Sequence, residues 1–110
     1  MALDSNDAAK RVLICYRQLT ELLKDLKDIT MVEAEARLKS YNHILETLKE
    51  CFALDSTFTD SVKHLQPISS GGAPNLKLGA DGVVLLATAH SFIELYLSPE
   101  YKSKAIGFHS

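Results

Sequence analysis

Residues 83–97 constrain this chain more than any other segment, because they are apolar on nearly every side of a helix. At about 100° per residue, one face collects larger apolar side chains: Leu85, Leu86, Ala89, Phe92, Ile93, Tyr96 and Leu97. The other side carries smaller or milder ones: Val83, Val84, Ala87, Thr88, Ser91 and Leu95. A helix that is apolar nearly all round is normally buried nearly all round. The first face therefore predicts a place in the core, and the second face needs a covering.

Local signals predict the limits of this helix. Asp81 can supply an N-cap and Pro99 cannot continue a helix, so we expect a helix over residues 82–97. Proline is favoured at the first position of a helix, so one more short helical turn is expected over residues 99–104.

Two long amphipathic helices are predicted earlier in the chain, over residues 7–27 and 31–53. Apolar positions in the first recur at three- and four-residue spacing: Val12, Cys15, Leu19, Leu22, Leu26 and Ile29. The second repeats the pattern: Ala34, Leu38, Tyr41, Leu45, Leu48 and Phe52. Such stripes are typical of helices that face a core. Thr30 and Glu33 fit a capping box at the second start, and the short connection predicts an antiparallel αα-hairpin.

Leu13 and Ile14 do not fit the apolar stripe of the first helix, because both project toward its polar side. Single exposed apolar residues are common on protein surfaces. These two residues are therefore expected either to be exposed or to contact a partner.

The second half of the chain is predicted to hold a short helix and a long loop. Asp55 can cap a helix over residues 57–65, and residues 66–80 contain two of the three prolines and three of the five glycines. Such a loop permits a long crossover to the last helix. We therefore expect a single all-α domain over residues 1–110, a four-helix bundle that is built on the N-terminal hairpin and ends in a short helical turn.

Composition excludes several classes of function. Twelve Lys and Arg against fourteen Asp and Glu leave a net charge of −2, and no basic cluster predicts nucleic-acid binding. The apolar run over 83–97 is shorter than the ~20 residues of a membrane span. No secretory signal is visible, so we expect a soluble cytoplasmic protein without a membrane span. Cys15 and Cys51 are expected to be reduced and buried.

The strongest chemical candidate is a pair on the apolar helix. His90 and Glu94 stand four residues apart and can touch. With Tyr96 they could line a small pocket, in which the imidazole acts as a base. No nucleophile or anion site accompanies them, and no Cys or His spacing matches a zinc site. We therefore expect no catalytic residues, no cofactor and no metal.

Three coverings of the second helical face remain open: the short helix with the Pro/Gly loop, another protein chain, or an apolar ligand. The leading hypothesis is a non-enzymatic interaction or self-association module. Its partner is another protein or a second copy, as in a homodimer, at this interface: Val84, Ala87, Ser91, Leu95, Leu13 and Ile14. The alternative is a small enzyme or a carrier of apolar ligands with a pocket at His90, Glu94 and Tyr96.

Overall fold

The chain folds into helices throughout the part that the computed structural model describes, residues 4–69, 71 and 74–104. The elements in chain order are α1 (Ser5–Leu22), the 3₁₀ turn η1 (Leu26–Asp28), α2 (Met31–Phe52), α3 (Ser56–Val62), α4 (Pro74–Tyr96) and α5 (Pro99–Lys104). None of these described residues forms a strand. The predicted all-helical class is confirmed.

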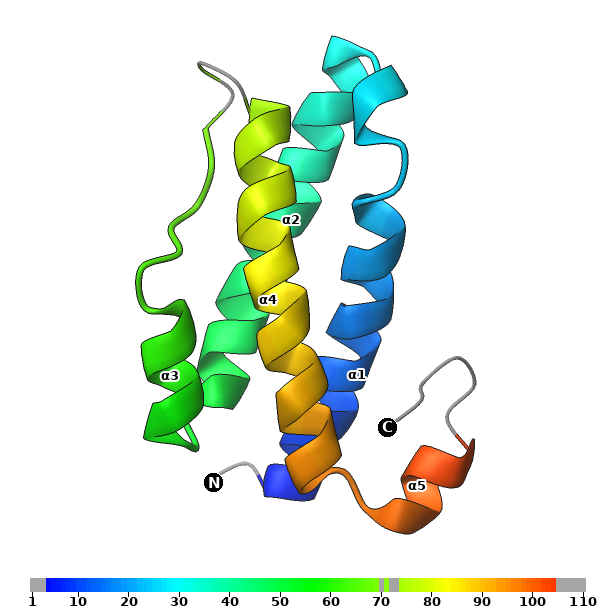
Figure 1. The fold of residues 1–110 in the computed structure, drawn as a ribbon, viewed down its shortest axis with the longest axis vertical. Helices are drawn as coiled ribbons and strands as arrows, with labels where there is room; N and C mark the ends of the chain where they lie inside the picture. Colours follow the sequence, from blue (N-terminus) through cyan, green and yellow to red (C-terminus); the bar gives the residue numbers. More distant parts are fainter. Residues whose placement is uncertain (1–3, 70, 72–73, 105–110) are drawn as a thin grey trace.

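Three long helices form the body of the molecule (Figure 1). α1 and α2 are antiparallel neighbours, and α4 runs opposite to α1 and in the same direction as α2. Each of the three packs on the other two, with the most extensive contact between α1 and α4. α3 packs against α2 and α4 at one end, and the following segment returns along the body to the start of α4 (Figure 1).

The core lies where these helices meet. Its largest fully buried side chains come from every long helix: Leu13, Leu19, Tyr41, Leu45, Leu48, Phe52, Leu85, Phe92 and Ile93. Near α3 the core is aromatic, because Phe92 lies 5.3 Å from Phe52 and 5.1 Å from Phe58 between ring centroids. The larger apolar face of α4 is therefore a core face.

Local caps start three of the helices. Asp4 accepts a hydrogen bond from the Asn6 N–H, Thr30 from the Glu33 N–H at 3.2 Å, and Asp55 from the Thr57 N–H at 3.0 Å. Each bond satisfies a backbone donor that the first helical turn leaves without a partner. Thr30 and Asp55 were both expected to cap.

α1 ends earlier than the predicted residue 27. Its last helical residue is Leu22, and Asp25 then takes a left-handed conformation with φ of 57°. The guanidinium of Arg37, on α2, donates to the carbonyls of Leu22 and Lys24. A side chain distant in sequence therefore satisfies the end of α1.

α4 begins earlier than predicted, at Pro74 instead of residue 82. Residues 74–80, expected to belong to the loop, are its first two turns, and Asp81 lies inside the helix rather than at its cap. Pro74 occupies the first position, where its ring suits the helix. α3 likewise ends at Val62 and not at residue 65.

The apolar run over residues 83–97 is too short to span a membrane, which is why no span was expected. α4 is longer than that run, so this reason no longer holds. With 23 residues it is the one helix in the described part of the chain that is long and apolar enough, by length and composition, to cross a membrane. A core helix of a water-soluble protein passes the same test, and α4 buries Leu85, Phe92 and Ile93 completely.

The segment that follows α3 is fastened to α2. The Asn42 side chain donates to the Ile68 carbonyl at 3.0 Å and accepts from the Ile68 N–H at 2.8 Å. Leu65 and Ile68 are buried in the core. This segment therefore covers part of α2.

Candidate functional site: the exposed face of α4

The second face of α4 is open to solvent. We call it the α4 face, and its exposed members are Leu76, Ala80, Val83, Val84, Ala87, Ser91 and Leu95. Leu76 is 78% exposed, Val83 63% and Leu95 63%, while the same helix buries Leu85 and Phe92 completely. α3 and the segment after it, which were one expected covering, leave these side chains uncovered in the described part of the chain.

The α4 face runs along nearly the whole helix. Apart from the adjacent Val83 and Val84, successive members stand three or four residues apart, so they form one stripe about 28 Å long. The stripe carries one charged side chain near each end. Glu94 lies at the same helical angle as Leu76, Lys77 lies at the same angle as Leu95, and both are exposed.

The structure separates the six residues predicted for one interface. Val84, Ala87, Ser91 and Leu95 do share the α4 face and are exposed. Leu13 is only 2% exposed, so the expectation that it projects toward solvent is wrong. The physical reason is that α1 packs against both α2 and α4, which buries a wider arc of α1 than its apolar stripe indicated.

Ile14 is exposed, at 56%, but it belongs to a different surface. It lines a hollow of about 200 Å³ between α1 and α2, next to Arg11, Cys15 and Thr47. Ile14 therefore does not join the α4 face.

His90 and Glu94 meet as the sequence indicated. The Nδ1 atom of His90 lies 3.5 Å from Oε1 of Glu94, and the His90 ring lies 5.9 Å from the Tyr16 ring. Tyr96 turns elsewhere, because its hydroxyl donates to the carboxylate of Asp55 at the start of α3. The expected pocket of three residues is thus not assembled, and none of the four grooves described in the molecule is lined by any of them.

The hydrogen bond between Tyr96 and Asp55 shifts both groups. It lowers the pKa of the Asp55 carboxyl, with help from the Thr57 backbone N–H. It also raises the pKa of the Tyr96 hydroxyl, which keeps its proton while it donates to a carboxylate. The bond joins α3 to the end of α4, so its role is structural.

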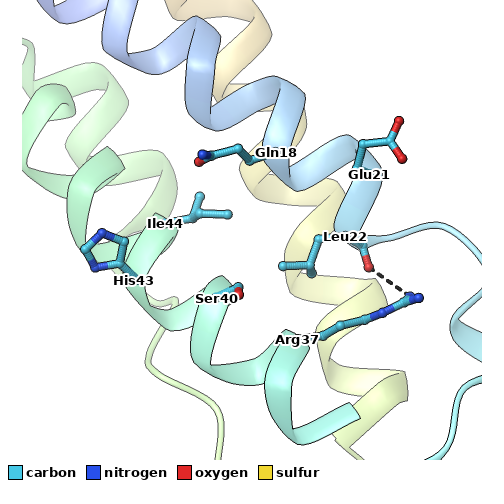
Figure 2. Close-up of a pocket in the computed structure, with 7 residues that line it drawn as sticks. All are labelled: Gln18, Glu21, Leu22, Arg37, Ser40, His43 and Ile44. Carbon is cyan, nitrogen blue, oxygen red and sulfur yellow. Dashed lines mark hydrogen bonds between the residues drawn. The ribbon is translucent and has the colours of Figure 1, made fainter. Parts of the chain in front are cut away.

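A groove that sequence reasoning missed lies between α1 and α2 (Figure 2). It has a volume of about 550 Å³ and is lined by Gln18, Glu21, Leu22, Arg37, Ser40, His43 and Ile44. Arg37 points to the carbonyl at the end of α1, and Glu21 and His43 lie at opposite edges. These polar groups do not converge on one point.

The two cysteines lie in the core, as predicted. Burial is the main cause that raises the pKa of Cys15 to about 11, and it also raises the pKa of Cys51. A thiol with a raised pKa stays protonated near neutral pH and is a poor nucleophile. Within the residues described, no three His, Cys, Asp or Glu side chains gather in a way that could hold a metal ion.

No known protein family matches this chain, and no curated protein and no solved structure shows significant similarity to it. The α4 face is therefore interpreted from its physical properties.

Proposed function

We propose that this protein is a non-enzymatic interaction module that binds a helix of another polypeptide on the α4 face. In this proposal α1 to α4 act as a four-helix bundle, with α3 as the short member, that holds α4 rigidly. The observation that carries it is the exposure of Leu76, Val83 and Leu95 on a helix whose opposite side is completely buried.

The driving force is removal of apolar surface from water. Full burial of one Val or Leu side chain is worth roughly 1.5–3 kcal/mol, and contiguous exposed apolar patches mark interaction sites. Three large members of the α4 face are each more than half exposed. A partner that covered them would gain most of that free energy.

The shape of the face suits another helix. Ala80, Ala87 and Ser91 lie along its middle, so a second helix axis can approach closely. Leu76 and Leu95 stand at the two ends and would pack against the flanks of the partner. Lys77 and Glu94 stand near the two ends of the stripe, so a partner has to pair their charges or leave them in water.

The groups available for chemistry near α4 are engaged in structural contacts. His90 pairs with Glu94, and Tyr96 donates to Asp55. This arrangement supports a binding role over the enzymatic alternative.

Photochemical cross-linking in cells tests the proposal. A photoreactive phenylalanine analogue is placed at Ser91 on the α4 face and, as a matched control, at the exposed Ala36 of α2. We expect protein adducts from position 91, few from position 36, and loss of the adducts when Leu95→Glu is added. Equal adducts from both positions, or none from position 91, would refute the proposal.

A further inference from the structure

Six of the seven members of the α4 face form a pattern that is nearly the same from either end; the seventh, Val83, has no exposed counterpart, because reversal places it on the buried Thr88. The pattern contains two rows with four-residue spacing, Leu76–Ala80–Val84 and Ala87–Ser91–Leu95. Reversal of the helix about the point between Leu85 and Leu86 exchanges the rows. Leu76 then takes the place of Leu95, Ala80 that of Ser91, and Val84 that of Ala87. After the exchange each row still has a leucine at its outer end and alanine, serine or valine at its inner positions.

From this symmetry we infer that the α4 face pairs with the α4 face of a second copy, antiparallel, about a two-fold axis beside Leu85 and Leu86. The inference rests on the proposed function and names its partner. A two-fold contact uses one surface twice, so that surface has to be complementary to its own reversed image. The two rows of the α4 face meet this requirement.

The two-fold axis fixes which residues of the two copies meet. It places Ala80 opposite Ser91 of the second copy, and Val84 opposite Ala87. The small side chains stand near the crossing point, where the axes are closest. Leu76 and Leu95 meet farther from the crossing point, where the helix axes diverge and larger side chains are needed to fill the gap.

Charge also favours the antiparallel arrangement. Lys77 lies within the face near its N-terminal end, and Glu94 lies within it near its C-terminal end. A parallel pair would place the two lysines at one end and the two glutamates at the other. The antiparallel pair brings ends of opposite charge together and also opposes the two helix dipoles. Salt screens charges over about 10 Å, so orientation depends mainly on packing.

The size of the contact indicates its strength. One pair of crossing helices buries less than the ~1,200 Å² of a standard stable interface. We therefore expect a weak and reversible dimer, with a dissociation constant in the micromolar range or above.

Sedimentation equilibrium of the whole chain tests self-association. The series runs from about 10 µM to about 1 mM, as a weak interface requires. We expect a monomer–dimer equilibrium that Ala87→Glu weakens at least tenfold and that Ala36→Glu leaves unchanged. Both alanines are exposed on helices, so helical circular dichroism should show that both variants fold. A monomer at every concentration overturns the inference, and so does a dimer that is insensitive to Ala87→Glu.

Disulfide trapping then tests the orientation. Ala80→Cys and Ser91→Cys proteins are oxidised separately and as a mixture, and the buried Cys15 and Cys51 do not take part. We expect a cross-link between positions 80 and 91 in the mixture only, because like positions in an antiparallel pair stand about 16 Å apart along the axis. Efficient cross-linking of Ala80→Cys alone would show a parallel pair and overturn the inference. If the chain is monomeric but the photoreactive group at position 91 still gives adducts with another protein, the inference fails and the proposed function stands. If those adducts are also absent, both the inference and the proposed function are refuted.

Discussion

Gly82 sets how closely α4 approaches the end of α1, and its replacement by alanine gives a direct test of the packing. A Cβ atom at position 82 would stand 2.7 and 2.8 Å from the two methyl carbons of Leu23 and 3.3 Å from its Cγ. All three atoms belong to the Leu23 side chain, so a methyl group at position 82 forces that side chain to move. Gly79 lies one turn earlier, where a Cβ atom would meet only Leu26, at an ordinary 3.6 Å.

The two glycines thus form a matched pair. Glycine to alanine inside a helix stabilises by up to about 1 kcal/mol, and this gain is common to both positions. Inserting a methyl group into filled space costs roughly 1–3 kcal/mol, and this cost applies only at position 82. We expect Gly79→Ala to raise the free energy of unfolding by up to about 1 kcal/mol. Gly82→Ala should fall about 1–3 kcal/mol below Gly79→Ala.

Urea unfolding followed by far-ultraviolet circular dichroism measures both variants. The slopes with denaturant should stay equal, so that the midpoints report stability alone. Adding Leu23→Ala to each variant completes a double-mutant cycle, and we expect it to recover most of the deficit at position 82. Equal stabilisation by both alanines would refute the close approach of Leu23 to α4.

Three other predictions follow from individual side chains. Tyr96→Phe should lower thermal stability, because it removes the donor to Asp55. Tyr41→Phe should leave the free energy of unfolding unchanged or raise it by about 1 kcal/mol, because the buried Tyr41 hydroxyl has no hydrogen-bond partner among the described residues. The pKa of Asp55 is lowered in the folded protein, so its contribution to stability is present above the usual carboxyl pKa of about 4. That contribution is lost as the pH falls through the lowered pKa. On acid titration, the Asp55→Asn variant should therefore lose less stability than the natural chain. Cys15 and Cys51 should react with Ellman's reagent only after unfolding, and rapid reaction of the native protein would contradict their burial.

The features that could be predicted from the sequence are those with local causes. Thr30 and Asp55 cap helices through backbone donors two or three residues away, and such contacts depend little on the rest of the chain. The apolar stripes of α1 and α2 were likewise visible, because a period close to 3.6 residues marks the buried side of a helix.

The features that were missed have causes distant in sequence. α1 ends at Leu22 in a left-handed turn, and Arg37 on α2 satisfies its carbonyls. Leu13 is buried because α1 packs against both α2 and α4, which no pattern within α1 indicates. Gly79 was expected in the loop over residues 66–80 but lies inside α4, and α4 needs Gly82 for its close approach to α1.

The candidate site also combines features with local causes and features whose causes are distant in sequence. Hydropathy alone showed that the second face of α4 is apolar. Whether α3 and the loop cover that face depends on where they pack, and the described chain leaves it exposed. The face also extends to Leu76 and Ala80, because α4 begins at Pro74, and this extension completes the symmetry of the two rows.

The most direct test of the central claim is the concentration dependence of backbone amide chemical shifts by NMR. On dilution from about 1 mM, amides under the α4 face, including Ala80, Ala87 and Ser91, should shift together with one dissociation constant. Amides in the groove between α1 and α2, such as Ser40 and His43, should not move. Constant shifts throughout α4, or shifts confined to the α1–α2 groove, would contradict the claim that α4 carries the interaction surface.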